Sequence, residues 1–386
     1  MVSIILRAIT AVAAILSAAP ALAEPIERKL DGLVAEGMRR SGSQGLASAV
    51  IDNGRVELVK SWGKRNARGD PLTKNTVMYG ASITKAMFGY LVAQLADEGK
   101  LNLDASIATY LPQPLPDYAN EAEKFAPYQH LAGNERWRKL TPRILLNHSS
   151  GFANFYWLND DERLKFHFEP GARYAYSGDG INLLQFVIER GLGLSVEDEM
   201  QRRFFLPLGM TNASFLWQPH FAKNLADGWK EDGTIEPHDE RSKVRAAGSM
   251  DASIADLAKL VAAFVRGDGL SKQARAAMVA PHLPIRTPSQ FPSLQTEPTA
   301  ARFPVLAAGL GVISFTGPQG RGFQKGGHND STGNTLVCLE KGRRCVLILS
   351  NDVRSEQLFP GLVKAVLGET GFPWSWEYGV KDWAKN

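Results

Sequence analysis

A serine and a lysine three residues apart, Ser82 and Lys85, stand at the start of an apolar segment in "GASITKAMFGYL". A serine hydroxyl is a weak nucleophile until a base takes its proton, and a lysine whose pKa is lowered can be that base. Residues 83–99 carry apolar side chains at helical spacing, which places Ser82 at the N-cap or in the first turn of a helix. Residues i and i+3 share one helix face, so the spacing predicts a nucleophile with its base. The alternative is a serine that only caps the helix, beside a solvated lysine.

A second Ser-x-x-Lys match occurs at Ser61 and Lys64. It lies beside Gly63 in a segment that resembles a β-strand, where residues i and i+3 point to opposite faces. That geometry is poor for proton transfer, so the context favours Ser82 as the nucleophile.

A tyrosine candidate lies in "PGARYAYSGDG", which precedes a helical run. Its proline, glycines and small residues predict a loop that carries Tyr176 and Ser177 and can enter a cleft. A lysine and a tyrosine side by side can activate one another, because the cation favours the phenolate. Packing alone is the alternative role for a loop tyrosine.

The chain has 386 residues, of which 44% are hydrophobic and 22% charged, enough to bury a large core and to form about two lobes. An apolar run over residues 8–20 follows Arg7 and ends in Ala21-Leu22-Ala23. This pattern predicts a cleaved signal peptide over residues 1–23. We therefore expect a periplasmic or secreted protein with no transmembrane segment after cleavage; a retained N-terminal anchor is the alternative.

Charge and motif content argue against several classes of partner. The formal net charge is only +4 and no Lys/Arg-rich run stands out, so we expect no nucleic-acid partner. The histidines are scattered and no Cys/His cluster is present, so we expect no metal site. Gly-x-Ser-x-Gly and glycine-rich phosphate motifs are absent, and no cofactor is expected.

The two ends of the chain predict strands, and the middle predicts helices. "GLASAVIDNGRVELVKSWG" alternates around Asn53-Gly54, the strongest short hairpin signal. Short apolar runs near the other end cover 309–315, 322–327, 334–340 and 344–351. Together they predict a meander of three more strands. A helix over 355–371 is expected to follow them. Apolar residues at helical spacing predict helices over 83–99, 181–193, 196–205 and 253–267.

The expected fold class is therefore α/β (α+β), an antiparallel sheet built from both chain termini and flanked by helices, with an inserted, mainly helical lobe. We place the sheet lobe at residues 24–80 and 241–386 and the helical lobe at residues 81–240. A site is expected at their junction, since pockets favour domain interfaces. Residues 111–138 and 281–304 are too rich in proline, asparagine or charge for regular structure, and each is either a loop near the cleft or a surface insertion.

The two cysteines, Cys338 and Cys345, flank "LEKGRR". If Lys341-Gly342 forms a two-residue hairpin turn, the cysteines face each other across two strands within bridging distance. We expect a cross-strand disulfide; two buried free thiols are the alternative.

Six motifs occur in a particular order: Ser-x-x-Lys, "LTPRILLNHSSGF", "PGARYAYSGDGINLL", "FLPLGMTNASF", "AAGSMDASIADLAKL" and "KGGHNDSTGNTLV". This order resembles the serine β-lactamase and penicillin-binding-protein superfamily in its class C-like branch, over nearly all of the mature chain. That branch includes D-alanyl-D-alanine carboxypeptidases, D-aminopeptidases and β-lactamase-fold carboxylesterases. The resemblance implies a β-lactamase/transpeptidase-like fold, with Ser82 as the acylated nucleophile, Lys85 as its proton partner and Tyr176 as the tyrosine of a Tyr-x-Asn element. His148 resembles a structural position of the family.

The chain departs from the family pattern at two places. Gly178 stands where the Tyr-x-Asn element has asparagine, and Ser177 or Asp179 is a candidate replacement. The Lys-Thr-Gly element aligns either with Lys325-Gly326-Gly327, which we favour slightly, or three residues later with His328. In the later alignment Asp330 takes the glycine position.

The expected substrate-binding residues are Ser177, Lys325, Gly327, His328 and Ser331. The backbone N–H of Ser82 and one N–H from residues 325–331 would stabilise an oxyanion. We expect a serine hydrolase that forms an acyl-enzyme with a D-alanyl peptide, a β-lactam or a related amide or ester, so its partner is a small-molecule or peptidoglycan-derived substrate. The alternatives are a carboxylesterase of the same fold and a penicillin-binding sensor without turnover.

Overall fold

The computed structural model describes residues 25–119, 124–298 and 300–379. The predicted signal peptide, residues 1–23, lies outside the described residues. The helices are α1 (Ile26–Ser41), α2 (Ile83–Asp97), α3 (Pro142–Leu146), α4 (Gly178–Gly191), α5 (Val196–Met200), α6 (Ile254–Arg266), α7 (Lys272–Met278), α8 (Phe359–Leu367) and α9 (Trp374–Glu377). Short 3-10 helices cover Ile107–Thr109, Leu115–Asp117, Tyr128–Leu131, Glu135–Lys139, Tyr156–Leu158, Pro219–Asn224 and Val353–Leu358, and a π-helical turn covers Gln201–Phe205.

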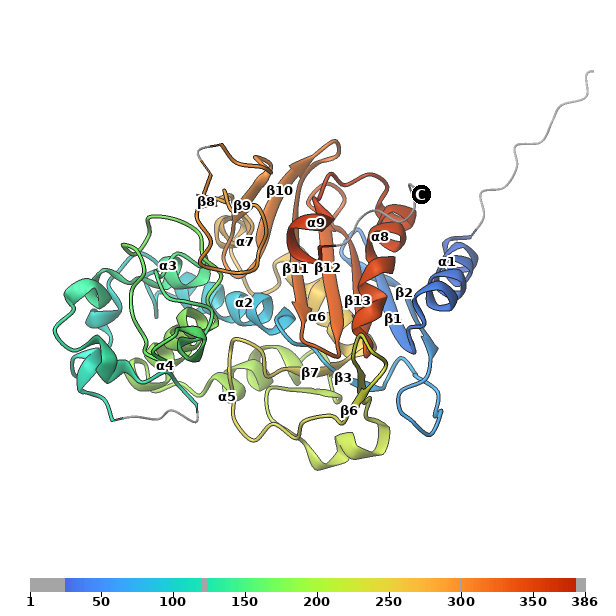
Figure 1. The fold of residues 1–386 in the computed structure, drawn as a ribbon, viewed down its shortest axis with the longest axis horizontal. Coiled ribbons are helices and arrows are strands. Elements are labelled where there is room, and N and C mark those ends of the chain that lie inside the picture. Colours follow the sequence, from blue (N-terminus) through green and yellow to red (C-terminus); the bar gives the residue numbers. More distant parts are fainter. Residues whose placement is uncertain (1–24, 120–123, 299, 380–386) are drawn as a thin grey trace, which may run out of the picture.

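The strands are β1 (Gly45–Asp52), β2 (Arg55–Gly63), β3 (Val77–Tyr79), β4 (Ala213–Ser214), β5 (Gly228–Trp229), β6 (Ile235–Glu236), β7 (Asp251–Ser253), β8 (Leu283–Pro284), β9 (Leu306–Ala308), β10 (Ile313–Gly317), β11 (Gly320–His328), β12 (Gly333–Leu339) and β13 (Arg344–Ser350). Eight of them form one antiparallel sheet in the order β2-β1-β13-β12-β11-β10-β9-β8. The N-terminal hairpin thus pairs with the last strand of the chain, as Figure 1 shows. This arrangement confirms the predicted fold class.

Several elements were not predicted from the sequence. The late meander contains four strands, β10 to β13, instead of three, and β8 and β9 extend its edge. Helix α1 was also missed, and so was the three-stranded sheet of β3, β7 and β4. The short strands escaped because two or three residues carry too little alternation to be recognised. The residue boundaries of the two predicted lobes stay a prediction.

The large sheet is buried on both faces. Helices α1 and α8 pack on one face, and α2 and α6 on the other (Figure 1). Strand β1 shows the alternation that this requires: Ala47, Ala49 and Ile51 join the core beside α2 and α6, whereas Leu46 and Val50 join the core beside α1 and α8. Packing on both faces holds the strands in register and fixes the position of β11 relative to α2.

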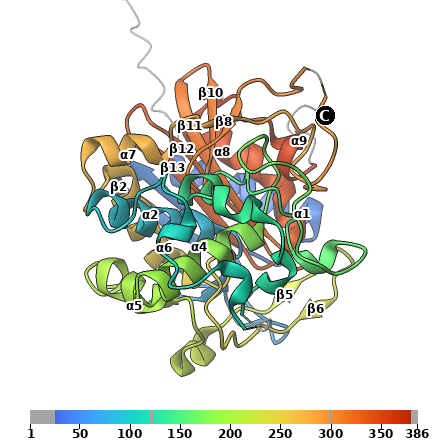
Figure 2. The same cartoon turned by 90° about the vertical axis from the view of Figure 1, so that its left-hand side faces the viewer.

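Helix α2 is buried on all sides and has no solvent-exposed polar face over residues 83–95. Every residue from Ile83 to Leu95 is buried, although the sequence suggested one apolar stripe. One side of α2 packs against β11 and β12, and the core around it includes side chains from α4 and from the segment between α2 and α4, which lies in the foreground of Figure 2. A helix that is enclosed all round is rigidly positioned, which suits a helix that carries a reactive group at its first turn.

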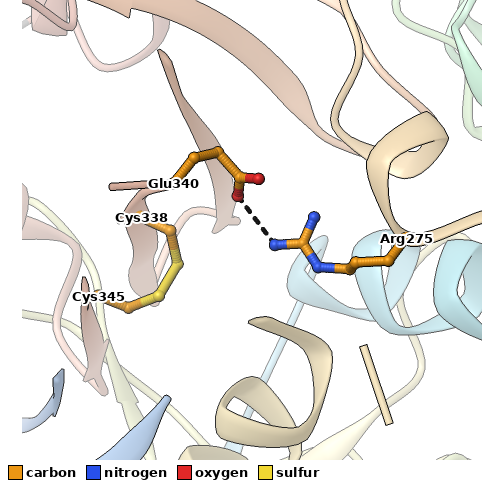
Figure 3. The surroundings of a disulfide bond; sticks show 4 residues. All are labelled: Arg275, Cys338, Glu340 and Cys345. Atoms are coloured by element: carbon orange, nitrogen blue, oxygen red, sulfur yellow. Dashed lines mark hydrogen bonds and ion pairs between the residues drawn. A yellow bond between two sulfur atoms is a disulfide. The ribbon is translucent and has the colours of Figure 1, made fainter. Parts of the chain in front are cut away.

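The predicted disulfide is confirmed. Cys338 of β12 and Cys345 of β13 are direct register partners with their Cα atoms 4.1 Å apart, and their sulfur atoms are bonded. Beside the disulfide, Arg275 of α7 donates from Nη2 to Oε1 of Glu340 at 2.8 Å (Figure 3). The ion pair ties α7 to the end of β12. None of the helices over the described ranges is both long and apolar enough to cross a membrane.

Candidate active site

The hydroxyl of Ser82 lies where three predicted residues meet. Lys85 Nζ lies 2.9 Å from Ser82 Oγ, and Tyr176 Oη donates to the same oxygen at 2.8 Å. Lys85 reaches the serine from the first turn of α2, while Tyr176 comes from the loop before α4. The structure therefore brings together the serine, lysine and tyrosine that the sequence singled out.

Ser82 stands at the N-cap position of α2, but its side chain does not cap the helix. Ala81 has a φ of 45°, a left-handed conformation that costs a non-glycine residue roughly 1–3 kcal/mol. Neighbouring hydrogen bonds hold it: Gly80 donates to the Met250 carbonyl at 2.9 Å, and Thr84 Oγ1 donates to the Ala81 carbonyl at 2.5 Å. The Ser82 side chain makes no capping hydrogen bond. The alternative of a purely capping serine is therefore wrong.

Tyr176 is held by His148 and by its own loop. Its ring stacks on the imidazole with centroids 4.4 Å apart, and the Ser177 backbone N–H donates to His148 Nδ1 at 3.2 Å. The Ala175 N–H donates to the His148 carbonyl at 2.8 Å. Both flanks of Tyr176 are thus anchored to one buried histidine, whose pKa burial lowers well below its ordinary value, with the charges of Lys85 and Lys325 adding to the effect.

The electrostatics of the site favour neutral groups. Burial lowers the pKa of Lys85 well below its ordinary value, and the positive charge of Lys325 lowers it further. Burial also raises the pKa of Tyr176 above its ordinary value, although its hydrogen bond to Ser82 opposes this. Both shifts favour a neutral amine and a neutral phenol over the ammonium–phenolate pair that the sequence suggested. A neutral Lys85 has a free lone pair for the proton of Ser82.

Strand β11 distinguishes between the two alignments of the Lys-Thr-Gly element. Successive strand residues face opposite ways, so Lys325 and Gly327 share the face toward α2. Lys325 Nζ lies 3.4 Å from Tyr176 Oη, and a Cβ on Gly327 would stand 2.9 Å from the Ser82 backbone nitrogen. The ring of His328 instead pairs with Glu356, with Nδ1 and Oε1 3.0 Å apart. The geometry thus favours Lys325-Gly326-Gly327, while His328 lines the cavity at the end of the strand.

The two serines that were predicted to bind substrate, Ser177 and Ser331, do not line the cavity. The Ser177 hydroxyl donates to the Ala153 carbonyl at 2.8 Å and accepts from the Gly180 N–H at 3.0 Å, so it caps α4 and is buried. Ser331 Oγ donates to Glu236 Oε2 at 2.5 Å and lines a separate, smaller hollow. The predictions for Ser177 and Ser331 are corrected, because both hydroxyls hold the fold together.

The candidates that could replace the missing asparagine are also absent from the cavity wall. Burial raises the pKa of Asp179 to about 7, and its carboxylate accepts from the Tyr156 N–H at 2.6 Å. Asn154 lines the cavity instead, and its Oδ1 accepts from the Gly178 N–H at 3.0 Å. An amide therefore does lie beside this position, but it comes from another loop.

The cavity beside Ser82 has a volume of about 940 Å³. Its wall includes a stack of Phe155 on Trp157, with centroids 4.4 Å apart, and the half-exposed ring of Phe291. Sequence reasoning missed these wall residues: Tyr79, Asn154, Phe155, Trp157, Asn182, Lys230, Glu231, Asp232, Arg245, Gln290, Phe291, Asn329 and Glu377. The proline-rich stretch 281–304 supplies Gln290 and Phe291, so it is a loop at the cleft, whereas none of residues 111–119 and 124–138, the part of the other stretch that the structure describes, lines this cavity.

The second Ser-x-x-Lys match and a metal site are the other candidate sites to be considered. The Ser61 hydroxyl donates to the Leu72 carbonyl at 3.0 Å, so the second Ser-x-x-Lys match serves the fold. Within the part of the chain that the structure describes, His, Cys, Asp and Glu side chains form no group of three or more that could hold a metal ion.

Comparisons with known proteins point to one family. The model of the family described as Beta-lactamase matches residues 30–367. A curated relative, Protein flp of Staphylococcus aureus (strain COL), is 26% identical over 216 residues, which is 54% of this chain and 42% of the relative's length. The chain therefore spans less than half of that relative.

Solved structures share the fold at low sequence identity. The D-alanine carboxypeptidase AmpC from Burkholderia cenocepacia superposes with a TM-score of 0.69 at 16% identity, covering 89% of this chain and 98% of the other. A class C beta-lactamase superposes with the same TM-score of 0.69 at 17% identity, covering 89% and 96%. With the family match over most of the chain, these similarities show that the chain belongs to the Beta-lactamase family, within the serine β-lactamase and penicillin-binding-protein superfamily.

Proposed function

We propose that this protein is a serine hydrolase that forms an acyl-enzyme on Ser82. The observation that carries the proposal is the convergence of Lys85 Nζ and Tyr176 Oη on Ser82 Oγ, at 2.9 and 2.8 Å, beside a cavity of about 940 Å³. A nucleophile within hydrogen-bond distance of a neutral amine, with a second proton-carrying group on its other side, is the arrangement that acyl transfer requires.

In the first step Ser82 Oγ attacks the carbonyl carbon of an ester or amide, and its proton passes to Lys85 Nζ. The bond from that carbon to the leaving group then breaks. Tyr176 gives its proton to the leaving atom and regains one from Lys85, which returns to the neutral amine. Water attacks the acyl-serine in the second step, its proton follows the same route in reverse, and Ser82 is restored.

The developing oxyanion needs backbone donors close to Ser82. The N–H of Ser82 and an N–H at the end of β11 are the candidates, because Gly327 packs directly against the Ser82 nitrogen. The pairing of β10 with β11 ends at Ile313 and Gln324, so the β11 edge beyond Gln324 is not covered by β10. A substrate lying along that edge would present its carbonyl to Ser82.

The position of Lys325 bears on the substrate class. A D-alanyl peptide or a β-lactam carries a carboxylate, for which a lysine on this strand is a natural partner. Here Lys325 is only 2% exposed, and its Nζ donates to the Gly326 carbonyl at 3.0 Å and lies near Tyr176. It is not part of the cavity wall. This observation favours an ester or amide without that carboxylate, as in a carboxylesterase, over a D-alanyl peptide or β-lactam.

The test compares the purified protein with Ser82→Ala and with Ser61→Ala, which alters the other Ser-x-x-Lys match. Each is incubated with a short-chain nitrophenyl ester, a chromogenic cephalosporin and a D-alanyl-D-alanine peptide. We expect ester turnover that falls about a thousandfold or more in Ser82→Ala and is retained in Ser61→Ala. Equal turnover by the protein and by Ser82→Ala would contradict the mechanism.

The same experiment distinguishes the remaining alternatives. Turnover of the peptide or the cephalosporin would assign a carboxypeptidase or a β-lactamase. Stoichiometric labelling of Ser82 by penicillin without turnover, followed by mass spectrometry, would assign a sensor that stays acylated.

A further inference from the structure

An unpartnered carboxylate lies in the wall of the cavity. Glu377 is the last residue of α9 and is 7% exposed, and neither Oε1 nor Oε2 has a hydrogen-bond partner within the described chain. Burying a carboxylate without a partner is unfavourable, so such groups are rare unless something binds them. Glu377 contributes to the cavity wall, but both of its oxygens are covered by protein, so a bound cation reaches them only after a local shift of the covering atoms.

This carboxylate occupies the place of a side chain on β11. A Cβ built on Gly326 would stand 1.7 Å from Glu377 Oε1, so only glycine fits there. The next residue, Gly327, packs against the Ser82 nitrogen. Because consecutive strand residues face opposite ways, Glu377 and Ser82 lie against opposite faces of β11, and both residues line the same cavity.

Glu377 interacts with Lys325 without a hydrogen bond: burial lowers the pKa of Lys325, and the charge of Glu377 opposes that shift. The Lys325 amine is committed to the Gly326 carbonyl and lies beside Tyr176, at 3.0 and 3.4 Å. The cations of the cavity wall have acidic neighbours of their own: Lys230 lies 3.7 Å from Glu236, and the charge of Arg245 acts on Asp179. Glu377 therefore has a cationic neighbour in Lys325, but both of its oxygens lack a hydrogen-bond donor.

Aromatic rings complete the surroundings. Phe155 and Trp157 stack in the cavity wall, and Phe291 lies over Tyr176 with centroids 5.3 Å apart. Aromatic faces attract cations through the ring quadrupole, so rings and a carboxylate in the wall of one cavity can together hold an ammonium group.

Resting on the proposed function, we propose that Glu377 binds a positively charged ammonium group of the substrate. The preferred substrates are then esters or amides that carry a cationic amine close to the scissile carbonyl, and anionic analogues are disfavoured by repulsion. The competing interpretation is that Glu377 serves only as a counter-charge for Lys325. In that case its removal would change the rate with every ester by the same factor and leave the preference for a cation unaltered.

The first arm measures binding without any reaction. Ser82→Ala is titrated by calorimetry at neutral pH with benzylammonium, benzyl alcohol and benzoate, which share a ring and differ in charge. We expect benzylammonium to bind about tenfold more tightly than benzyl alcohol, and benzoate to bind least tightly. Adding Glu377→Gln should reduce the advantage of the cation to about twofold or less. Adding Glu369→Gln, an exposed glutamate outside the cavity, should leave it unchanged.

The second arm measures kcat/KM for two nitrophenyl esters. One is the ester of γ-trimethylammonio-butyrate, and the other is its isostere with a tert-butyl group in place of the trimethylammonium. The ratio of the two values should favour the cation about tenfold and approach one in Glu377→Gln. A ratio near one in the unsubstituted protein would overturn the proposal without any variant, and so would a ratio that survives Glu377→Gln.

The two arms separate this proposal from the proposed function. If neither ester is turned over, the serine hydrolase fails, yet the calorimetry still decides whether Glu377 binds a cation. If the neutral ester is turned over through Ser82 without any preference for the cation, only the role of Glu377 is overturned.

Discussion

The phenol ring of Tyr176 stacks on the imidazole ring of His148, with the planes inclined by 28°. The same imidazole accepts the backbone N–H of Ser177, so one buried side chain fixes both the ring and the chain direction of the tyrosine loop. Neither residue is adjacent to the other in sequence, and their contact sets the position of Tyr176 Oη over Ser82.

His148→Ala should therefore misplace Tyr176. We expect kcat for the ester to fall about tenfold to a hundredfold with little change in KM. The unpaired Ser177 N–H and the vacated space should lower the free energy of unfolding by about 2–4 kcal/mol. His148→Asn, which restores an acceptor near the N–H, should recover part of kcat. Steady-state kinetics and urea unfolding measure both quantities, and an unchanged kcat with lowered stability would limit His148 to a structural role.

Removing the charge of Lys325 should shift the pH dependence of the reaction. Lys85 must be neutral to accept a proton, so kcat/KM rises as pH passes upward through the pKa of Lys85. Burial and the Lys325 cation both lower that pKa. In Lys325→Met the second cause is gone, the pKa of Lys85 rises, and the acidic limb of the pH–rate profile moves to higher pH. A profile that keeps its acidic limb in Lys325→Met would argue against this coupling.

The same lysine should make stability depend on pH in the alkaline range. Burial lowers the pKa of Lys325 to about 8 from an ordinary value of 10.5. Between these values the unfolded chain binds more protons than the folded chain, so the free energy of unfolding rises with pH across this window. The contribution of Lys325 is on the order of 3 kcal/mol over the full window. The free energy of unfolding can be measured with urea at about pH 7.5 and about pH 10, the two ends of this window. Its rise between these pH values should be smaller in Lys325→Met than in the unsubstituted protein.

Restoring the family asparagine at residue 178 should not create a better enzyme. A Cβ on Gly178 would stand 2.5 Å from Cε1 of Phe155, so Gly178→Asn must displace that ring from the cavity wall. We expect a loss of about 1–3 kcal/mol in the free energy of unfolding from overpacking and a lower kcat/KM for the ester. The double variant Gly178→Asn with Phe155→Ala should relieve the clash. Thermal unfolding of the two single variants and the double variant would show whether their losses of stability are non-additive.

The disulfide should stabilise the sheet measurably. Cys338 and Cys345 are seven residues apart, and closing so short a loop contributes roughly 2 kcal/mol in the chain-entropy description. The double variant Cys338→Ala and Cys345→Ala should lose about this amount in urea unfolding. A reductant should destabilise the unsubstituted protein to a similar extent and leave the double variant unchanged. Equal stability of the two oxidised proteins would show that the bridge contributes nothing to folding.

The sequence by itself determined the parts of this protein that depend on local spacing. Ser82 and Lys85 share a helix turn whatever surrounds it, and the short turn over residues 340–343 brings Cys338 and Cys345 into register. Alternation and turn residues likewise predicted the hairpin at the N-terminus and most of the late meander. The ordered motifs added Tyr176, because family resemblance carries information about packing that no short pattern contains.

Only the tertiary structure decided what depends on contacts between distant segments. Whether Lys325 or His328 meets Tyr176 depends on which face of β11 packs against α2, and a short glycine-rich strand does not reveal its inner face. Helix α2 lost its solvent face because the segment that follows folds back over it, which no periodicity within the helix records. The proposed role of Glu377 likewise required a C-terminal helix to place one carboxylate against Gly326, since a side chain acquires a partner, or lacks one, only when the whole chain has packed.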